Sequence, residues 1–214
     1  MAAKVLVVDY GIGNVRSVCR AFEYCGAEVE LSDDPKKISG ADRVVLPGVG
    51  AINHCFDELR QRNMIEHLTD FTLTERPLLG ICVGMQMMMD TSWEFKEIGC
   101  FGWISGKVVE IPHKGSNGVS HKIPHIGWSN LELPEGCDNW EGSILQDLST
   151  KDQVYFVHSF MALPKDKKIW LAETKYDGTK ICAAVNHGSL TGTQFHPEKS
   201  GKVGLKIIQN FLTQ

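Results

Sequence analysis

The first part of the chain repeats one pattern: a short apolar run, a turn, and then a stretch with helical spacing. A short run that is apolar throughout is typical of a parallel strand buried on both faces. Strands that alternate with helices in this way predict an α/β fold with a central, mostly parallel sheet and helices on both faces. The expected strands are 4–9, 27–31, 42–46 and 78–81, and the expected helices are 15–25, a short one starting near 35, 52–68 and 85–90.

From Gly99 onward the pattern changes to glycine, aromatic and β-branched residues in alternation. Alternation of this kind predicts antiparallel strands, so we expect a β-rich extension of the sheet in the second half. The pair Asp177-Gly178 is a favoured hairpin turn and predicts a hairpin there. The expected strands are 99–111, 130–133, 153–160, 169–175 and 181–187, followed by a closing helix at 204–212.

Length and composition narrow the class of protein. The 214 residues contain no linker or repeat, which predicts a single domain, 1–214. A net charge of −4 gives no reason to expect nucleic acid or an anionic membrane as a partner. The first apolar run is too short for a signal peptide or a membrane span, so we expect a cytoplasmic protein.

Cysteine and histidine usage argues against a metal site or disulfide framework. The seven cysteines are an odd number and form no C-x-x-C pair. His121 and His125 are four apart, but Pro124 between them disfavours a shared helical face. The turn Gly11-Ile12-Gly13 lacks the third glycine of a dinucleotide fingerprint. We therefore expect no metal and no cofactor.

Residues 76–86, Arg-Pro-Leu-Leu-Gly-Ile-Cys-Val-Gly-Met-Gln, show the pattern of a nucleophile elbow with Cys82 as the nucleophile. Gly80 and Gly84 flank the cysteine at the positions where a sharp strand-to-helix turn leaves no room for side chains. The following helix would favour the thiolate through its N-terminal dipole, and the Val83 N–H would face a developing oxyanion. The alternative is a buried cysteine in an ordinary tightly packed turn.

A cysteine nucleophile needs a base, and Gln194-Phe195-His196-Pro197-Glu198 supplies a candidate. Pro197 is expected to hold the chain extended, which would place His196 and Glu198 on the same side. Glu198 would then fix the imidazole tautomer and leave the other ring nitrogen of His196 facing the thiol of Cys82. The alternative is a surface turn with an incidental histidine.

These motifs together resemble those of class I, triad-type glutamine amidotransferases. Pro-Gly-Val-Gly at 47–50, Gly-Ile-Cys-Val-Gly-Met-Gln at 80–86 and Phe-His-Pro-Glu-Lys-Ser at 195–200 occur in that family's order. A closer resemblance, to the glutaminase subunits of imidazole glycerol phosphate synthase, rests on 9–14, 46–51, 124–128 and 155–159. It spans essentially the whole chain and implies the flavodoxin-like fold of the family.

The resemblance implies roles for individual residues. Cys82 would form a γ-glutamyl thioester with L-glutamine, with His196 as the base and Glu198 as its orienting partner. Val83 and a peptide N–H of Val49 or Gly50 would form the oxyanion hole. The substrate's amino-acid end would be held by Gly48, Gln86, His158, Ser159 and Phe160.

The resemblance also implies a partner, a (β/α)8 barrel cyclase that receives ammonia through a protected channel and forms imidazole glycerol phosphate and AICAR. The positions that match this interface are Asn14, Trp128, Tyr155 and Lys199. Val83 and Met87 leave a related alternative, a paralogue that supplies ammonia for nucleotide-sugar amination in surface-polysaccharide synthesis. A second alternative is a stand-alone cysteine hydrolase with no partner.

Overall fold

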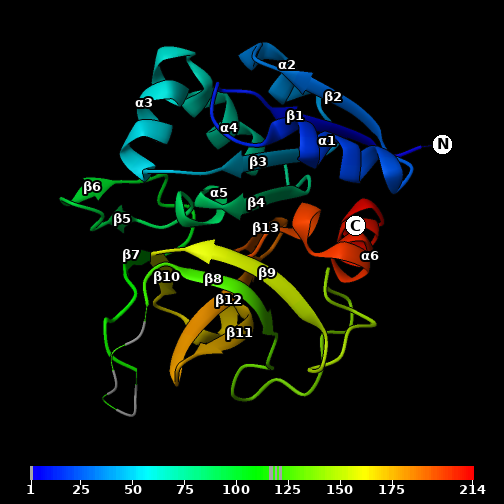
Figure 1. The fold of residues 1–214 in the computed structure, drawn as a ribbon. Helices are drawn as coiled ribbons and strands as arrows, with labels where there is room; N and C mark the ends of the chain where they lie inside the picture. The colour runs from blue at the N-terminus through cyan, green and yellow to red at the C-terminus, as the bar shows by residue number, and fades with distance from the viewer. Residues whose placement is uncertain (1, 116–117, 119, 121) are drawn as a thin grey trace.

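The computed structural model describes residues 2–115, 118, 120 and 122–214. Seven strands form the main sheet: β1 (Lys4–Val8), β2 (Glu28–Ser32), β3 (Val44–Gly48), β4 (Leu78–Cys82), β11 (Trp170–Tyr176), β12 (Thr179–His187) and β13 (Leu190–Thr193). Their order is β11-β12-β13-β4-β3-β1-β2 (Figure 1). From β2 to β13 all neighbours pair in parallel, and β12 and β11 add an antiparallel edge. The prediction of a mostly parallel sheet is confirmed.

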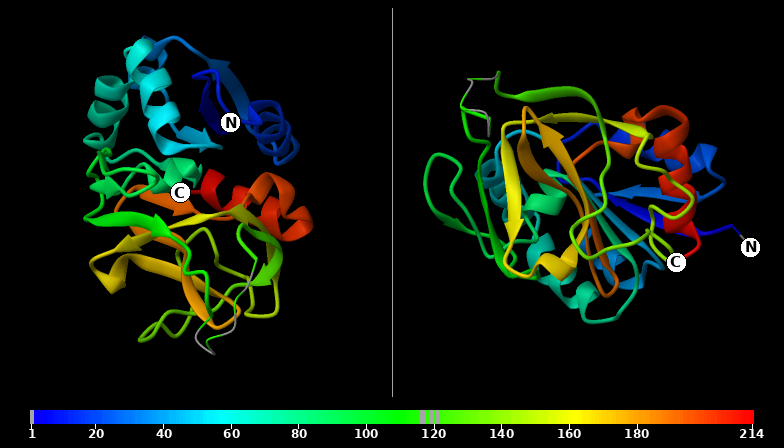
Figure 2. Two further views of the ribbon diagram at one scale, coloured as in Figure 1. Left: turned by 60° about the vertical axis from the view of Figure 1, so that its left-hand side comes forward. Right: turned by 90° about the horizontal axis from the view of Figure 1, so that it is seen from below.

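Helices cover both faces of this sheet (Figure 2). They are α1 (Val15–Tyr24), α2 (Pro35–Gly40), α3 (Ile52–Gln61), α4 (Met64–Thr72) and α6 (Gly201–Leu212). α1 packs against α6 on one face, whereas α2 and α3 both pack against α4 on the other. This division follows from the strand order, because right-handed crossovers that move in opposite directions along a sheet lie on opposite faces.

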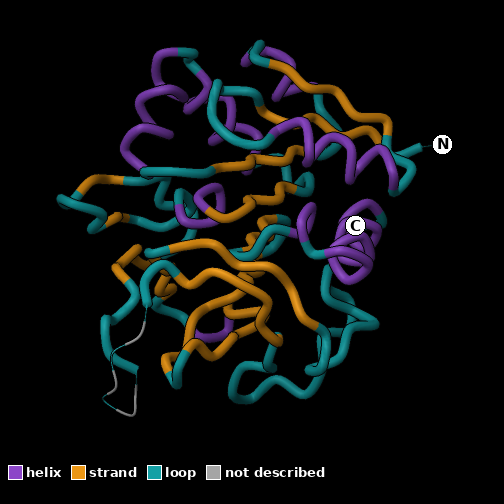
Figure 3. The backbone as a smooth tube through the Cα atoms, viewed as in Figure 1, coloured by secondary structure: helices purple, strands orange, loops and turns teal. Residues whose placement is uncertain are grey.

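The chain after α5 adds two smaller sheets; in the view of Figure 3 the strands β7 to β10 lie below β3 and β4. One has the order β10-β7-β5-β6, and the other is the antiparallel pair β8-β9. Their strands are β5 (Thr91–Ser92), β6 (Ile98–Gly99), β7 (Gly106–Glu110), β8 (His125–Asn130), β9 (Gln153–His158) and β10 (Phe160–Pro164). The remaining elements are the one-turn helix α5 (Val83–Gln86) and the 3₁₀ turns η1 (Lys167–Ile169) and η2 (Pro197–Lys199).

One apolar core connects the two halves. It runs from Val5 in β1 to Phe211 in α6, and includes Phe156 of β9 and Phe195, which follows β13. Phe22 of α1 and Phe211 meet edge to face, with ring centroids 6.1 Å apart. The β-rich segments therefore share the core of the parallel sheet.

The prediction of one helix over 52–68 was wrong, because this segment forms two helices, α3 and α4. Asn63 adopts a left-handed conformation, φ 55°, and separates α3 from α4. Asparagine tolerates this conformation better than most residues, so a break in a continuous apolar pattern falls naturally there. The predicted strand at 130–133 also differs: β8 begins at His125 and ends at Asn130.

The predicted hairpin is confirmed. β11 and β12 pair with Tyr176 opposite Thr179, and the two residues between them have positive φ, 46° at Asp177 and 81° at Gly178. Positive φ at both central residues is what a two-residue turn needs to match the twist of its strands. In the described part of the chain, no helix has both the length and the apolar character needed to cross a membrane.

Candidate active site

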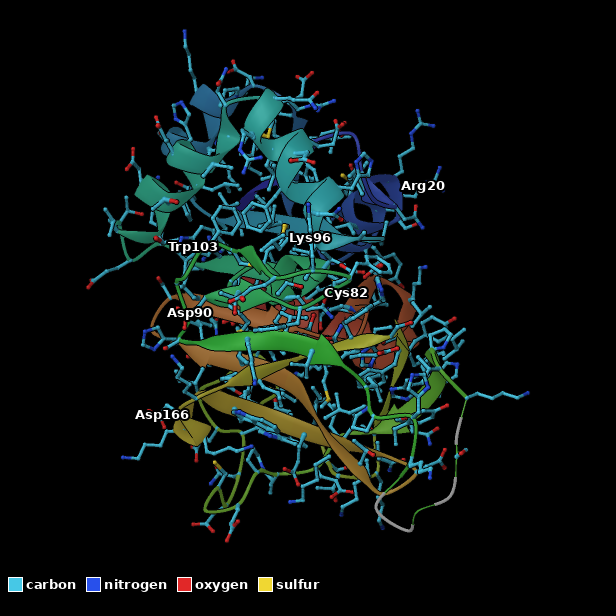
Figure 4. The ribbon with its side chains drawn as sticks, turned by 90° about the vertical axis from the view of Figure 1, so that its left-hand side faces the viewer. Arg20, Cys82, Asp90, Lys96, Trp103 and Asp166 are labelled. Carbon is cyan, nitrogen blue, oxygen red and sulfur yellow. The ribbon has the colours of Figure 1, made fainter. Side chains whose placement is uncertain are left out.

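Cys82 ends the fully buried strand β4 and has a strained backbone, φ 56° and ψ −108°. The flanking glycines show why the chain accepts this turn. A Cβ on Gly84 would overlap the carbonyl oxygen of Leu46, and one on Gly80 would lie 2.7 Å from the carbonyl carbon of Gly84. These distances are too short for any side chain, so the elbow predicted from the sequence is present. Figure 4 labels Cys82 near the middle of the molecule.

The helix after the elbow is shorter than predicted. α5 ends at Gln86, although a helix was expected over 85–90. The carbonyl groups of Met87, Met88 and Met89 accept hydrogen bonds from the N–H groups of Phe101, Ile104 and Gly102, at 2.8–3.0 Å. The helix is not continued because the N–H groups of Met88 and Met89 donate to carbonyls only three residues back, and the Asp90 N–H donates to the Gly106 carbonyl at 3.0 Å instead of to Gln86. The three methionines fill the core, each 0% exposed. A single turn also gives the sulfur little of the dipole that a long helix would provide.

His196 and Glu198 make the predicted contact, but through a different backbone. Pro197 and Glu198 lie in the 3₁₀ turn η2 rather than in an extended segment. His196 Nδ1 still lies 2.8 Å from Glu198 Oε1, and both side chains are at most 3% exposed. The backbone N–H of His196 donates to the carbonyl of Tyr155 at 3.0 Å, which fixes the histidine against β9.

The electrostatics of His196 fit a base that can become charged. Burial alone would lower the pKa of His196, but its interactions with Cys82 and Glu198 outweigh that effect and raise the pKa to about 10. Nε2 of His196 is buried and makes no hydrogen bond to the described residues. The ring therefore has one nitrogen held by Glu198 and one left for the thiol and a substrate.

A cavity of about 520 Å³ opens over Cys82 and collects most of the predicted site. Of the predicted residues, its lining includes Val49, Gly50, Cys82, Val83, Gln86, His158, Ser159, Phe160, His196 and Lys199. Gly48 lies instead behind the elbow, where a Cβ would be 2.8 Å from the Gly84 nitrogen and 2.9 Å from the Val83 Cβ. The size suits a small-molecule substrate.

The segment Val49-Gly50 lies beside the elbow because β3 pairs with β4, with Gly48 opposite Cys82. Gly50 has φ 78°, a conformation that favours glycine, and Val49 is 37% exposed. The thiol of Cys55 donates to the Val49 carbonyl at 3.5 Å and holds that peptide from behind. Two stretches of backbone, at 49–50 and at Val83, thus face the space above the sulfur.

Four residues that line the cavity were not predicted as site residues: Glu94, Phe95, Pro124 and Val157. Glu94 is buried, and its Oε2 accepts the Ile52 N–H at 2.7 Å. Burial raises the pKa of Glu94, and the hydrogen bond from Ile52 partly offsets this. A signal existed in the sequence: Ala51 cannot cap α3, so the N-terminus of α3 needs an acceptor from elsewhere in the chain. Phe95 is 84% exposed at the cavity and had no comparable signal.

The four predicted interface residues lie near the C-terminal ends of the parallel strands. Trp128 is 52% exposed and meets Tyr155 with ring centroids 6.0 Å apart. Lys199 is exposed on η2, and Asn14 is exposed at the start of α1, which contacts η2. Lys199 lines the cavity over Cys82, Asn14 and Trp128 are exposed, and Tyr155 is half-buried.

In the sequence, His121 and His125 were considered as a possible metal-binding pair. His125 lies on β8, with its Nδ1 3.1 Å from His158 Nε2. His121 is outside the described residues. Among the residues described, no group of three or more His, Cys, Asp or Glu side chains is arranged to hold a metal ion.

Comparisons with known proteins agree with this geometry. Residues 6–214 match the family model described as glutamine amidotransferase class-I. The chain is 48% identical to imidazole glycerol phosphate synthase subunit HisH 1 of Legionella pneumophila (strain Lens), over 98% of this chain and 99% of the relative. It is 42% identical to the HisH subunit of Pelagibacter ubique, over 97% and 98%.

A solved structure, PurLQS from Thermotoga maritima, has the same fold, with a TM-score of 0.70 at 18% identity over 100% of this chain and 99% of that one. The family model and the relatives both extend over nearly the whole chain. The chain therefore belongs to the class-I glutamine amidotransferase family.

Proposed function

We propose that this chain is the glutaminase subunit of an imidazole glycerol phosphate synthase, which hydrolyses L-glutamine to glutamate and ammonia. One observation carries the chemistry: Cys82 and His196 line one cavity, and the buried Glu198 holds the His196 ring from behind at 2.8 Å. The names of the relatives support the pathway, since both are subunits of that synthase. Residues 1–214 act as a single amidotransferase domain in this proposal, which the shared apolar core supports.

Substrate binding uses polar groups in the lining of the cavity. The α-ammonium group of glutamine needs acceptors, and the Glu94 carboxylate and Gln86 Oε1 supply them. Both Nε2 hydrogens of Gln86 are engaged, with the Phe160 carbonyl at 2.8 Å and Gln194 Oε1 at 2.9 Å. Only the oxygen of Gln86 is then left to face the substrate. Backbone groups of His158-Ser159-Phe160 bind the α-carboxylate, and Gly48 supports the elbow from behind.

In the first half of the reaction the Cys82 thiolate attacks the side-chain amide carbon of glutamine. The C–O double bond opens to an oxyanion, which accepts N–H groups from Val83 and from Val49 or Gly50. Loss of one such donor typically slows a reaction by about 10²–10³. His196, protonated by the thiol, then gives its proton to the amide nitrogen as the C–N bond breaks, and ammonia leaves.

In the second half water replaces ammonia. His196, neutral again, removes a proton from the water while the oxygen attacks the thioester carbon. The C–S bond breaks, glutamate leaves, and the thiolate and imidazolium are restored. Glu198 stays ionised throughout, because its part is to hold the Nδ1–H and stabilise the charged ring.

Ammonia then passes to a (β/α)8 barrel cyclase bound over the cavity. Several exposed apolar side chains support a docking surface: Val49, Trp93, Phe95, Ile126 and Trp128 are all at least 37% exposed. Val49 and Phe95 line the cavity itself, and exposed apolar groups are typical of protein interfaces. Asn14, Tyr155 and Lys199 lie beside them in this proposal. The seven free cysteines suit a reducing compartment, and we place the chain in the cytoplasm.

The test is synthesis by the complex of this chain with its cyclase, with either glutamine or ammonium as the nitrogen source. Cys82→Ala should abolish glutamine-dependent synthesis and leave ammonium-dependent synthesis unchanged. Loss of both activities would show that Cys82 has a structural role. Equal glutamine hydrolysis with and without the cyclase would refute the partner and favour a stand-alone hydrolase.

A further inference from the structure

Cys82 has a buried polar neighbour that none of these roles uses, Gln194. β13 pairs in parallel with β4, with Thr193 beside Ile81, so the next residues along the two strands lie side by side. Gln194 is 0% exposed, and its Nε2 lies 3.6 Å from Cys82 Sγ. A primary amide has a donating end and an accepting end, so its orientation decides how it affects the sulfur.

A backbone carbonyl sets this orientation. The Phe160 carbonyl can only accept, and Gln86 Nε2 donates to it at 2.8 Å. The second hydrogen of the same nitrogen goes to Gln194 Oε1, at 2.9 Å. With its oxygen engaged by Gln86, Gln194 must turn its nitrogen toward Cys82.

The Phe160 carbonyl is itself fixed from the other side. His158 Nδ1 lies 2.8 Å from it, so this nitrogen carries the proton and Nε2 of the same ring accepts. His125 Nδ1 is the donor to that Nε2, at 3.1 Å, and His125 Nε2 lies 2.9 Å from the Ser129 hydroxyl. Each link then has a single direction, and an ordered chain of hydrogen bonds extends from β8 to the sulfur.

We propose that Gln194 stabilises the reactive thiolate of Cys82 by donating its Nε2–H to the sulfur, and that Gln86 and the Phe160 carbonyl keep this donor in place. A hydrogen bond strengthens when its acceptor is charged, so the donor favours thiolate over thiol. The inference rests on the proposed function only in taking Cys82 as the nucleophile.

The proposal has a kinetic signature that general damage to the fold would not produce. A donor that makes the thiolate more abundant also makes it less nucleophilic, with a Brønsted coefficient of about 0.4–0.5. Without the donor, the pH midpoint for thiolate formation should rise by about one unit, since hydrogen bonds to charged groups have roughly that strength. The residue would then react about threefold more slowly at low pH and about threefold faster at high pH.

The experiment measures alkylation of Cys82 by chloroacetamide between pH 5 and 10 in the full-length chain, with the Cys82 peptide quantified by mass spectrometry. Gln194→Met removes the donor with little change of shape, and Gln209→Met, at an exposed position of α6, is the matched control. The other titratable groups near the sulfur are unchanged in both variants: Tyr10, Cys55, Glu94, His158, His196, Glu198 and Lys199.

We expect Gln194→Met to show the higher midpoint and crossing rate profiles, and Gln209→Met to match the wild type. A wild-type midpoint in folded Gln194→Met would overturn the proposal. If Gln194→Met fails to fold, NMR of the wild type decides: one Gln194 side-chain N–H proton should shift with the alkylation midpoint, and an unresponsive resonance would refute the donor role. Wild-type Cys82 that resists alkylation at every pH would instead count against the proposed function.

Discussion

The fit of Gly84 beneath β3 can be tested by adding one methyl group. In Gly84→Ala the new Cβ would overlap the Leu46 carbonyl oxygen and would lie 3.1 Å from its carbonyl carbon. Leu46 belongs to β3, which pairs with β4 on one side and β1 on the other, so it cannot move away freely. Relief of the overlap needs a shift of roughly 1 Å in a close-packed interior.

Overpacking of this kind typically costs about 1–3 kcal/mol, and we expect the upper end because the obstacle is backbone in a central strand. For a chain of this length, about 3 kcal/mol corresponds to a fall of roughly 6–12 °C in melting temperature. Gly40→Ala is the matched control, since a Cβ there meets nothing within 4 Å and φ is not positive. It should be neutral or slightly stabilising.

Calorimetry and urea unfolding of the two variants, with glutaminase assays of the complex, give the answer. Glutaminase activity should also fall at temperatures where Gly84→Ala is still folded, because any shift of the turn moves the Val83 N–H away from the oxyanion. Equal melting temperatures for Gly84→Ala and Gly40→Ala would refute the account of the elbow.

Two further predictions concern ionised groups at the site. The pKa of His196 is about 10 in the folded chain and near 6.5 in an unfolded one, so stability from this group is complete below pH 6.5 and is lost as the pH rises through 10. Glu198→Gln removes the partner of His196, so its unfolding free energy should fall less between these two pH values. The difference from the exposed control Glu97→Gln should be on the order of 1–3 kcal/mol, measured by urea unfolding at each pH. Equal falls in the two variants would contradict the ion pair. Glu94→Gln removes the charge that we propose binds the α-ammonium group of glutamine. In steady-state kinetics, KM for glutamine should rise about 10–100-fold, with a smaller change in kcat. An unchanged KM would exclude that role.

The features predicted correctly from the sequence are those that depend on neighbouring residues. The elbow follows from two glycines around one cysteine, and the β11-β12 hairpin follows from Asp177-Gly178. The contact between His196 and Glu198 was also predicted, although η2 achieves it through a 3₁₀ turn instead of an extended chain. Two residues that are this close in sequence can meet through more than one backbone path.

The features that the sequence did not predict depend on distant segments. The helix after Cys82 does not extend to Asp90 because the Asp90 N–H donates to the distant Gly106 carbonyl instead of to Gln86, and nothing within 83–90 reveals this. Glu94 reaches the site because α3, about forty residues earlier, lacks a cap of its own. In both cases the partner that decides the structure is known only once the chain is folded.

The pairing of β13 with β4 explains why the catalytic groups meet at all. After Cys82 the chain leaves the main sheet and builds β5 to β10, then returns to its edge as β11 and β12 before β13 pairs directly beside β4. Parallel pairing of Thr193 with Ile81 brings the residues after both strands to the same edge, so Gln194 lies against Cys82 and His196 follows two residues later. A slip of one residue would turn Phe195 toward the sulfur and reverse the direction of every side chain along β13. Gly192 disfavours such a slip, because a Cβ at its place would lie 2.4 Å from Met85 Cγ and neither Thr191 nor Thr193 would fit there. The register of one short strand therefore determines both the distance from base to nucleophile and the donor that faces the sulfur.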